Sequence, residues 1–308
     1  MSMPSDPSAT STRITRWLCC PECHAPLTVN GSEILCPSSG FRGSIRDDVA
    51  VMLPEATESF FDDTFEFMMH GKLNPGDWSF GYAQQIESLT RSLKPGMLLV
   101  DVGCGPGLPY ARPDGVEIIG LEPSFKSIRV NRQVDLRVLG SAYAMPLADA
   151  SVDAIVCFYA IHHMVGDKVN DSISNLSRAF REFGRVLKPN GTLFVFEMTP
   201  IALFLCLQAL GWNLGRRLIG KKLDMRFFSA KEVKAIGEQT LPRGTIHEMT
   251  EFKVSPAQPS HLFSACPGLE FRGSCTRWHR GFTNGECHPS ERPVGGHVQS
   301  NECLPRAA

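Results

Sequence analysis

The sequence has no apolar run near the roughly 18 residues that are needed to cross a bilayer. It also begins without the apolar core of a secretory signal peptide, and Asp6 argues against a transit peptide. The chain also lacks an excess of either charge, because 31 lysines and arginines balance 32 aspartates and glutamates. The composition therefore gives the chain no general attraction to nucleic acid or to an anionic membrane.

Cysteine is not scarce, but it lacks the arrangement of a disulfide framework. The eleven cysteines are odd in number and scattered, and two of them, Cys104 and Cys157, fall in expected buried strands. Without a secretory signal, this usage favours reduced thiols in a cytoplasmic protein. A chain of 308 residues that is 43% hydrophobic can bury one large core and carry appendages.

The central feature of the sequence is an apolar run followed by glycines at alternate positions. Residues 98–102 (LLVDV) have the composition of a strand that is buried on both faces. Gly103, Gly105 and Gly107 follow, and glycine lets the backbone come close to a ligand. The pattern predicts an α/β fold with a doubly wound, mostly parallel sheet and a ligand at the carboxyl end of this strand.

The spacing of these glycines differs from that of a dinucleotide fingerprint. Leu108 stands where G-x-G-x-x-G needs its third glycine, and Pro109 and Pro113 leave too little helix to hold a pyrophosphate. Glu122 ends a second apolar run, where a carboxylate accepts the ribose hydroxyls of an adenosine ligand. We therefore favour an adenosine ligand over an ordinary βαβ unit with a glycine turn.

Further segments occur in a fixed order and carry a resemblance. They read VDVGCGPG (100–107), IIGLEPS (118–124), GSAYAMPLADASVDAIVC (140–157), IHHM (161–164) and REFGRVLKPNGTLFVFE (181–197). Together they resemble class I S-adenosylmethionine-dependent methyltransferases, in the small-molecule branch related to the ubiquinone and menaquinone C-methyltransferases. The resemblance covers about residues 80–200 and implies a Rossmann-like methyltransferase fold with S-adenosylmethionine as the cofactor. It says little about the substrate.

The resemblance also implies which residues contact the cofactor. Asp101 would hold the glycine loop and meet the amino group of the methionine moiety, and Glu122 would bind the ribose. Ser141 stands where the family usually has an aspartate on the adenine amino group, and a hydroxyl accepts that hydrogen bond more weakly. The expected cofactor residues are Asp101, Gly103, Cys104, Gly105, Glu122, Pro123, Ser141 and Ala142.

Two adjacent histidines are the catalytic candidates. His162 and His163 follow an expected strand at residues 151–159, at the edge where cofactor and substrate meet. A histidine there could act as a general base, since its unperturbed pKa lies near 6.5. Methyl transfer from a sulfonium needs mainly alignment, so the alternative is that both histidines pack around the cofactor.

Residues 17–54 resemble the small zinc-ribbon modules that precede some methyltransferases. Cys20 and Cys23 form one CxxC knuckle and Cys36 begins a second, but Ser39 replaces the fourth thiolate. Two alternatives stay open: a ribbon that binds zinc through Cys20, Cys23 and Cys36, and a ribbon that keeps its shape without metal. With this module, the expected divisions are a disordered segment at 1–16, the ribbon at 17–54, the methyltransferase domain at 55–254 and an irregular tail at 255–308.

Two segments bear on the substrate. The aromatic stretch at 60–78 and the apolar stretch at 200–214 fall where the resembled family builds its acceptor pocket. They favour a small apolar acceptor, such as a quinone-, lipid- or polyketide-like molecule. The second stretch precedes Arg216, Arg217, Lys221 and Lys222, a pattern that also fits a helix in peripheral contact with a membrane.

Two alternative functions remain. One group of ribosomal RNA guanine methyltransferases also carries an N-terminal zinc module, but acidic residues in the first 80 positions, Asp47 and Asp48 among them, oppose binding to phosphates. The departures at Ser141 and in the tail would suit an inactive S-adenosylmethionine-binding protein. We expect no nucleic-acid partner, and the sequence leaves the acceptor atom and the oligomeric state open.

Overall fold

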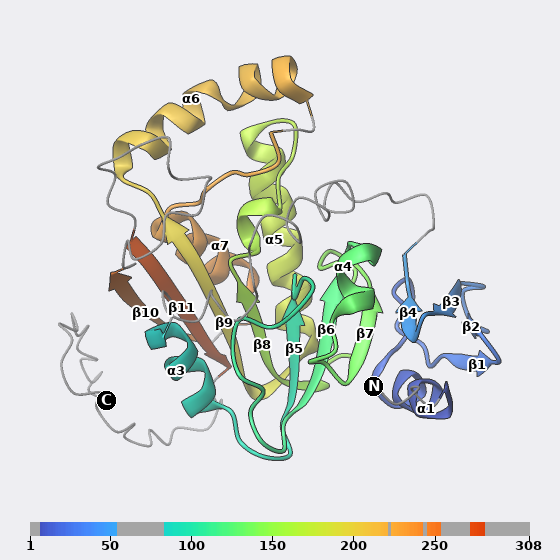
Figure 1. Ribbon diagram of the computed structural model, residues 1–308. Coiled ribbons are helices and arrows are strands. Elements are labelled where there is room, and N and C mark those ends of the chain that lie inside the picture. The colour runs from blue at the N-terminus through green and yellow to red at the C-terminus, as the bar shows by residue number, and fades with distance from the viewer. Residues whose placement is uncertain (1–6, 54–82, 221–222, 243–244, 254–271, 281–308) are drawn as a thin grey trace, which may run out of the picture.

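The described residues of the computed structural model form one sheet with helices on both faces (Figure 1). The structure describes residues 7–53, 83–220, 223–242, 245–253 and 272–280. The strand order is β1-β2-β3-β4-β7-β6-β5-β8-β9-β11-β10. The strands are β1 (Thr28–Asn30), β2 (Glu33–Leu35), β3 (Arg42–Arg46), β4 (Val49–Val51), β5 (Leu98–Val102), β6 (Glu117–Glu122), β7 (Leu136–Leu139), β8 (Val152–Phe158), β9 (Leu187–Thr199), β10 (Thr245–Lys253) and β11 (Arg272–Arg280).

The helices divide between the two faces of the sheet, and each face has its own buried cluster. Leu98 and Val100 of β5 pack in the cluster that α1, α5 and α7 cover, whereas Leu99 packs with α3 and α4 on the other face. This alternation follows from the two-residue repeat of a strand. The helices are α1 (Pro7–Trp17), α3 (Ala83–Ser92), α4 (Phe125–Val130), α5 (Val169–Val186), α6 (Ala202–Ile219) and α7 (Ala230–Thr240), with a 3-10 turn η2 (Ile161–His163).

Strand β5 lies at the centre of the parallel part of the sheet. It pairs in parallel with β6 on one side and with β8 on the other, and all five of its residues are buried. Strands β7 and β9 extend this parallel core outward. The doubly wound, mostly parallel α/β fold predicted from the sequence is therefore confirmed.

The N-terminal ribbon continues the same sheet. Strand β4 pairs in parallel with β7, with Ala50 opposite Val138, so that β1–β4 extend one edge of the sheet. The prediction of disorder over residues 1–16 is wrong from residue 7 onward, because α1 begins there. Ile14 and Trp17 are buried on one side of this helix, a helical spacing hidden in a composition of serine, threonine and proline. Residues 1–6 lie outside the described part of the chain.

The prediction of an irregular tail is wrong for residues 272–280, which form β11. This strand runs antiparallel to both β9 and β10 and joins them in one sheet. Its Trp278 is 2% exposed and packs edge-on against Phe180 of α5, with 5.3 Å between ring centroids. The Trp278 ring also packs closely on Gly237, because a Cβ added at that glycine would lie 2.7 Å from the ring. One large buried side chain, Trp278, thus packs β11 against the domain, although the other residues of this strand show little apolar pattern.

Several expectations fall outside the described residues. These are the aromatic stretch at 60–78 and the remainder of the tail, at 255–271 and 281–308. Among the helices that the structure describes, none combines the length and the apolar character needed to cross a membrane.

Candidate functional site

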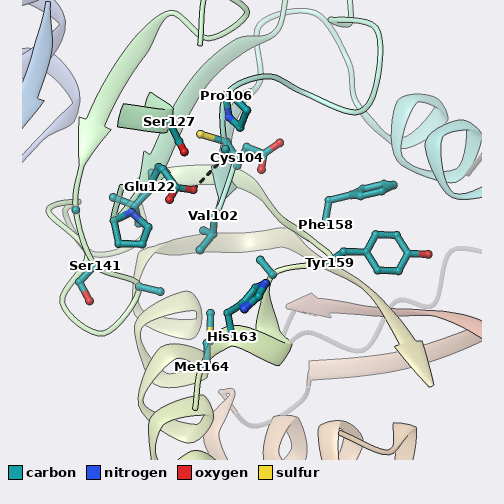
Figure 2. Close-up of a pocket in the computed structure, with 18 of the residues that line it drawn as sticks. Val102, Cys104, Pro106, Glu122, Ser127, Ser141, Phe158, Tyr159, His163 and Met164 are labelled. Atoms are coloured by element: carbon teal, nitrogen blue, oxygen red, sulfur yellow. Dashed lines mark hydrogen bonds between the residues drawn. The ribbon is translucent and has the colours of Figure 1, made fainter. Parts of the chain in front are cut away.

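A cavity of about 330 Å³ opens at the carboxyl ends of the central parallel strands (Figure 2). The turns that follow β5, β6, β7 and β8 line it, together with the end of η2. Ligands bind at this edge of an open parallel sheet, where neighbouring strands connect in opposite directions. All eight cofactor residues expected from the sequence line the cavity: Asp101, Gly103, Cys104, Gly105, Glu122, Pro123, Ser141 and Ala142.

The glycine turn after β5 leaves room for a ligand. Gly103 and Gly105 have φ angles of 73° and 56°, in the left-handed region that glycine adopts at low cost. A Cβ on Gly103 would lie 2.7 Å from the Cβ of Ala160, so the turn and the loop after β8 can approach only with glycine here. A Cβ on Gly105 would meet nothing within 4 Å. The conformation at Gly105 thus shapes the loop while the space beside it stays open.

Glu122 ties the glycine turn to the next loop. Its carboxylate lies at the end of β6 and is 5% exposed. One carboxylate oxygen accepts a hydrogen bond of 3.0 Å from the amide of Gly105 (Figure 2). The other accepts one of 3.0 Å from the amide of Ser124. Hydrogen bonds to a charged acceptor offset the cost of burying it. The carboxylate is therefore held in a fixed position at the cavity wall.

Asp101 is buried beneath the glycine turn and has a partner that the sequence did not suggest. The Tyr110 hydroxyl donates a hydrogen bond of 2.5 Å to its carboxylate. Burial raises the pKa of Asp101 to about 7, and this hydrogen bond opposes the shift. Tyr110 lies between two prolines in a segment without periodicity, so no sequence signal placed it here. A cationic group in the cavity would favour the ionised form of Asp101.

Ser141 lies in the turn after β7, on the same side of the cavity as Glu122. Its hydroxyl accepts a hydrogen bond of 3.1 Å from the amide of Tyr143 and so closes a local turn. Ala142 follows in the cavity wall. The hydroxyl at position 141 therefore shapes the loop that lines the cavity.

The opposite wall of the cavity is aromatic and apolar. Phe158 and Tyr159 line it, and their rings meet edge to face at 5.1 Å (Figure 2). Tyr159 has a φ of 53°, which is costly for a residue with a bulky side chain. The Gln85 side chain on α3 donates a hydrogen bond of 3.4 Å to the Tyr159 hydroxyl. Backbone strain of this kind gathers at functional sites.

The structure separates the two candidate histidines. His163 lines the cavity, and its Nδ1 lies 3.3 Å from a carboxylate oxygen of Asp224. Burial lowers the pKa of His163 below its usual value, although Asp224 opposes the shift, so that the imidazole is neutral at pH 7. His162 does not line the cavity. Its Nδ1 lies 2.8 Å from a carboxylate oxygen of Glu197, and both side chains are buried.

The expectation that both histidines face the reaction is therefore corrected for His162. Its ring packs against that of Phe227, 5.6 Å away, and its backbone amide donates to Glu197. These contacts make it a support for His163, whose ring centroid is 4.2 Å distant. Asp224 was missed in the sequence because it lies 61 residues beyond His163, in no recognisable motif.

The cysteines of the ribbon gather as the CxxC pattern predicts. The sulfur atoms of Cys20, Cys23 and Cys36 all lie within 4.8 Å of one another. The Ser39 hydroxyl lies 3.2 Å from the Cys20 sulfur, in the place of the fourth ligand. A hydrogen bond with this hydroxyl is the main cause that lowers the pKa of Cys36 to about 6. Three thiols and one hydroxyl fit a zinc ion incompletely, because serine is a poor ligand.

Replacing Ser39 tests whether the hydroxyl limits this site. We expect purified wild-type protein to contain well under one zinc ion per chain, and Ser39→Cys to raise the content to about one ion per chain. Elemental analysis of both proteins measures this, with Ser38→Cys as a control that adds a thiol next to the position. Full zinc occupancy in the wild type would show that the three thiols suffice.

Comparison with known proteins identifies the central domain. Residues 100–195 match a family described as a methyltransferase domain. An uncharacterized methyltransferase of Synechocystis is 25% identical over 51% of this chain and 77% of that protein. The demethylmenaquinone methyltransferase of Renibacterium salmoninarum is 30% identical over 34% of this chain and 43% of that protein. A mouse protein named Probable tRNA methyltransferase 9B is 27% identical over 36% of this chain and 24% of that protein.

The chain thus spans less than half the length of the last two relatives. The segment that matches the family contains the glycine turn, Glu122, Ser141 and both histidines. It also contains the carboxyl end of β5 and all of β6, β7 and β8, the strands whose carboxyl ends form the cavity. Residues 100–195 are therefore a methyltransferase domain of the class I, S-adenosylmethionine-dependent type.

Proposed function

We propose that the protein transfers the methyl group of S-adenosylmethionine to a small apolar organic acceptor of quinone-, lipid- or polyketide-like character. One observation carries this proposal. The cavity has Glu122 and Ser141 on one side, which we call the polar wall, and the rings of Phe158 and Tyr159 on the other, which we call the aromatic wall (Figure 2). An apolar acceptor gains most from burial against such a wall.

The polar wall suits the cofactor. Two amide hydrogen bonds hold the Glu122 carboxylate at the cavity wall, where it would accept hydrogen bonds from the ribose hydroxyls. Asp101 lies under the glycine turn, where the amino group of the methionine moiety would stabilise its ionised form. Ser141 and Ala142 would meet the adenine. These assignments leave the aromatic wall for the acceptor.

His163 would receive the proton of the acceptor. When bound, S-adenosylmethionine supplies a methyl group on a sulfonium sulfur, so that the transfer needs mainly alignment. His163 has Nδ1 turned to Asp224, so a proton on Nδ1 would leave Nε2 as the acceptor atom. The lowered pKa of His163 keeps this nitrogen unprotonated at neutral pH. Asp224 would stabilise the imidazolium that forms when the proton is taken up.

A second candidate function is methylation of RNA. The similarity to a protein named as a tRNA methyltransferase favours it, although only 24% of that protein is covered. RNA binding needs a basic surface and stacking platforms. The ribbon that precedes the domain carries Asp47 and Asp48 instead, and the chain has a net charge of −1. We therefore rank the small acceptor first.

Labelled transfer distinguishes these functions. We expect protein incubated with methyl-labelled S-adenosylmethionine to place the label in an organic-solvent extract of cells and not in total RNA. Scintillation counting of the two fractions measures this, and mass spectrometry of the product names the acceptor atom. Label in RNA, at a rate that falls with salt, would replace our proposal by the second candidate. Cofactor binding without transfer to either fraction would favour an inactive binding protein.

Loss of the Glu122 carboxylate should weaken cofactor binding. We expect Glu122→Ala to reduce the affinity for S-adenosylmethionine by about 1.5–3 kcal/mol, because two charged hydrogen bonds to the ribose disappear. Isothermal titration calorimetry measures this. Glu117→Gln, at the half-buried start of the same strand where the carboxylate pairs with Arg16, is the control and should bind as the wild type does. If Glu122→Ala binds S-adenosylmethionine with unchanged affinity, the ribose does not bind at Glu122.

His163 and Asp224 should affect turnover and leave cofactor affinity unchanged. We expect His163→Gln to lower kcat by about 10²–10⁴-fold with an acceptor that must lose a proton. Asp224→Asn should lower kcat less and shift the acid limb of the pH–rate profile, because it changes the environment of the imidazole. Rates on the active extract fraction measure this, with His24→Gln in the ribbon as the control. A full rate in His163→Gln would show that this side chain only packs at the cavity and takes no part in proton transfer.

A further inference from the structure

Helix α6 concentrates the exposed apolar surface of the described residues. Every large hydrophobic side chain that is exposed in this part of the chain lies in residues 201–219. In Figure 1, α6 is the outermost helix at the top of the view, beyond the ends of the central strands. The exposed side chains are Ile201, Leu203, Phe204, Leu207, Leu210, Leu214, Leu218 and Ile219.

One face of α6 is attached to the domain by a few specific contacts. The Trp212 indole, which is buried, donates a hydrogen bond of 3.1 Å to the Gly166 carbonyl. The Gln208 side chain bonds both the amide and the carbonyl of Phe227, and Arg216 pairs with Asp167 at 2.7 Å. Positions 208, 212 and 216 recur every four residues and so share one face of the helix.

The opposite face of α6 carries a stripe of leucines, which we call the leucine face. It consists of Leu203, Leu207, Leu210, Leu214 and Leu218, at steps of four and three residues. Their exposed fractions run from 61% to 81%, so the face is bare among the described residues. Exposed apolar patches of this extent mark interaction sites on soluble domains.

The sequence of α6 and the residues that directly follow it carry charge of one sign. No aspartate or glutamate occurs between residues 200 and 223. Arg217 is exposed near the end of the helix, and the sequence continues with Lys221 and Lys222. Leucine and phenylalanine on one side with basic residues at the end are typical of a helix that lies in a membrane interface. A second copy of the helix would offer these basic residues no acidic partner, whereas anionic lipid headgroups would.

We propose that the leucine face of α6 docks on an anionic lipid bilayer and lies in the interface without crossing it. A series of ring contacts also connects α6 with His162, which packs against His163 at the cavity. Phe204 contacts the ring of Phe227 at 6.0 Å, and Phe227 contacts His162 at 5.6 Å. An apolar acceptor would then enter the cavity from the bilayer, on the side where His163 lies. This consequence rests on the proposed function.

Vesicle flotation with the full chain tests the docking. We expect the protein to float with phosphatidylcholine–phosphatidylserine vesicles and much less with phosphatidylcholine alone. Leu207→Glu/Leu210→Glu should weaken the partitioning about tenfold or more, because charge replaces two inserted apolar side chains. Ala83→Glu/Gln84→Glu, on exposed positions of α3, adds the same charge elsewhere and should cost little. Circular dichroism and calorimetry with S-adenosylmethionine show whether each variant is folded.

Three outcomes would overturn the docking proposal. They are no binding to either vesicle, equal binding by the leucine-face variant, and a dimer in light scattering that this variant alone converts to a monomer. The last would show that a second copy covers the face. Vesicle binding requires no methyl transfer, so its failure leaves the proposed function standing. Failure of the labelled transfer would likewise leave the vesicle result unchanged.

Discussion

The parallel alignment of β5 with its neighbours β6 and β8 is the constraint on which the rest of the structure depends. It brings the carboxyl ends of separate strands to one edge, although the residues there are far apart in the chain. The glycine turn, Glu122 and His163 meet at one cavity for this reason. Because β5 is buried on both faces, its register is fixed by packing, and the positions of these groups are fixed with it.

The polar groups at the cavity are each held by a partner. Glu122 is held by two backbone amides and Asp101 by Tyr110. His163 rests on His162, which is fixed in turn by Glu197. Buried polar groups with satisfied partners stay in place, and a preorganised site needs this rigidity.

The sequence predicted the central sheet and many of the residues that line the cavity because both depend on local signals. A largely apolar strand, glycines at its end and a carboxylate at the end of the next strand lie within about 25 residues of one another in the chain. Tyr110 and Asp224 could not be predicted, because their partners are set by loops that carry no periodicity. The pairing of β4 with β7 was missed for a related reason, since edge-strand partners depend on tertiary contacts.

Two errors have a common physical cause. Helix α1 and strand β11 were taken for irregular chain because their composition is polar and rich in small residues. In each, one or two large side chains provide the anchor: Ile14 and Trp17 in α1, and Trp278 in β11. Composition averages over a segment, whereas burial depends on single positions. The same limit explains why the sequence could not separate the roles of His162 and His163.

The identity of the cofactor at the glycine turn is the central claim, and calorimetry of the wild-type protein tests it most directly. Titrations with S-adenosylmethionine, with S-adenosylhomocysteine and with NAD would be compared under the same conditions. The structure and the methyltransferase match predict binding of the first two compounds at a single site and no binding of NAD. Binding of NAD without binding of S-adenosylmethionine would contradict the account.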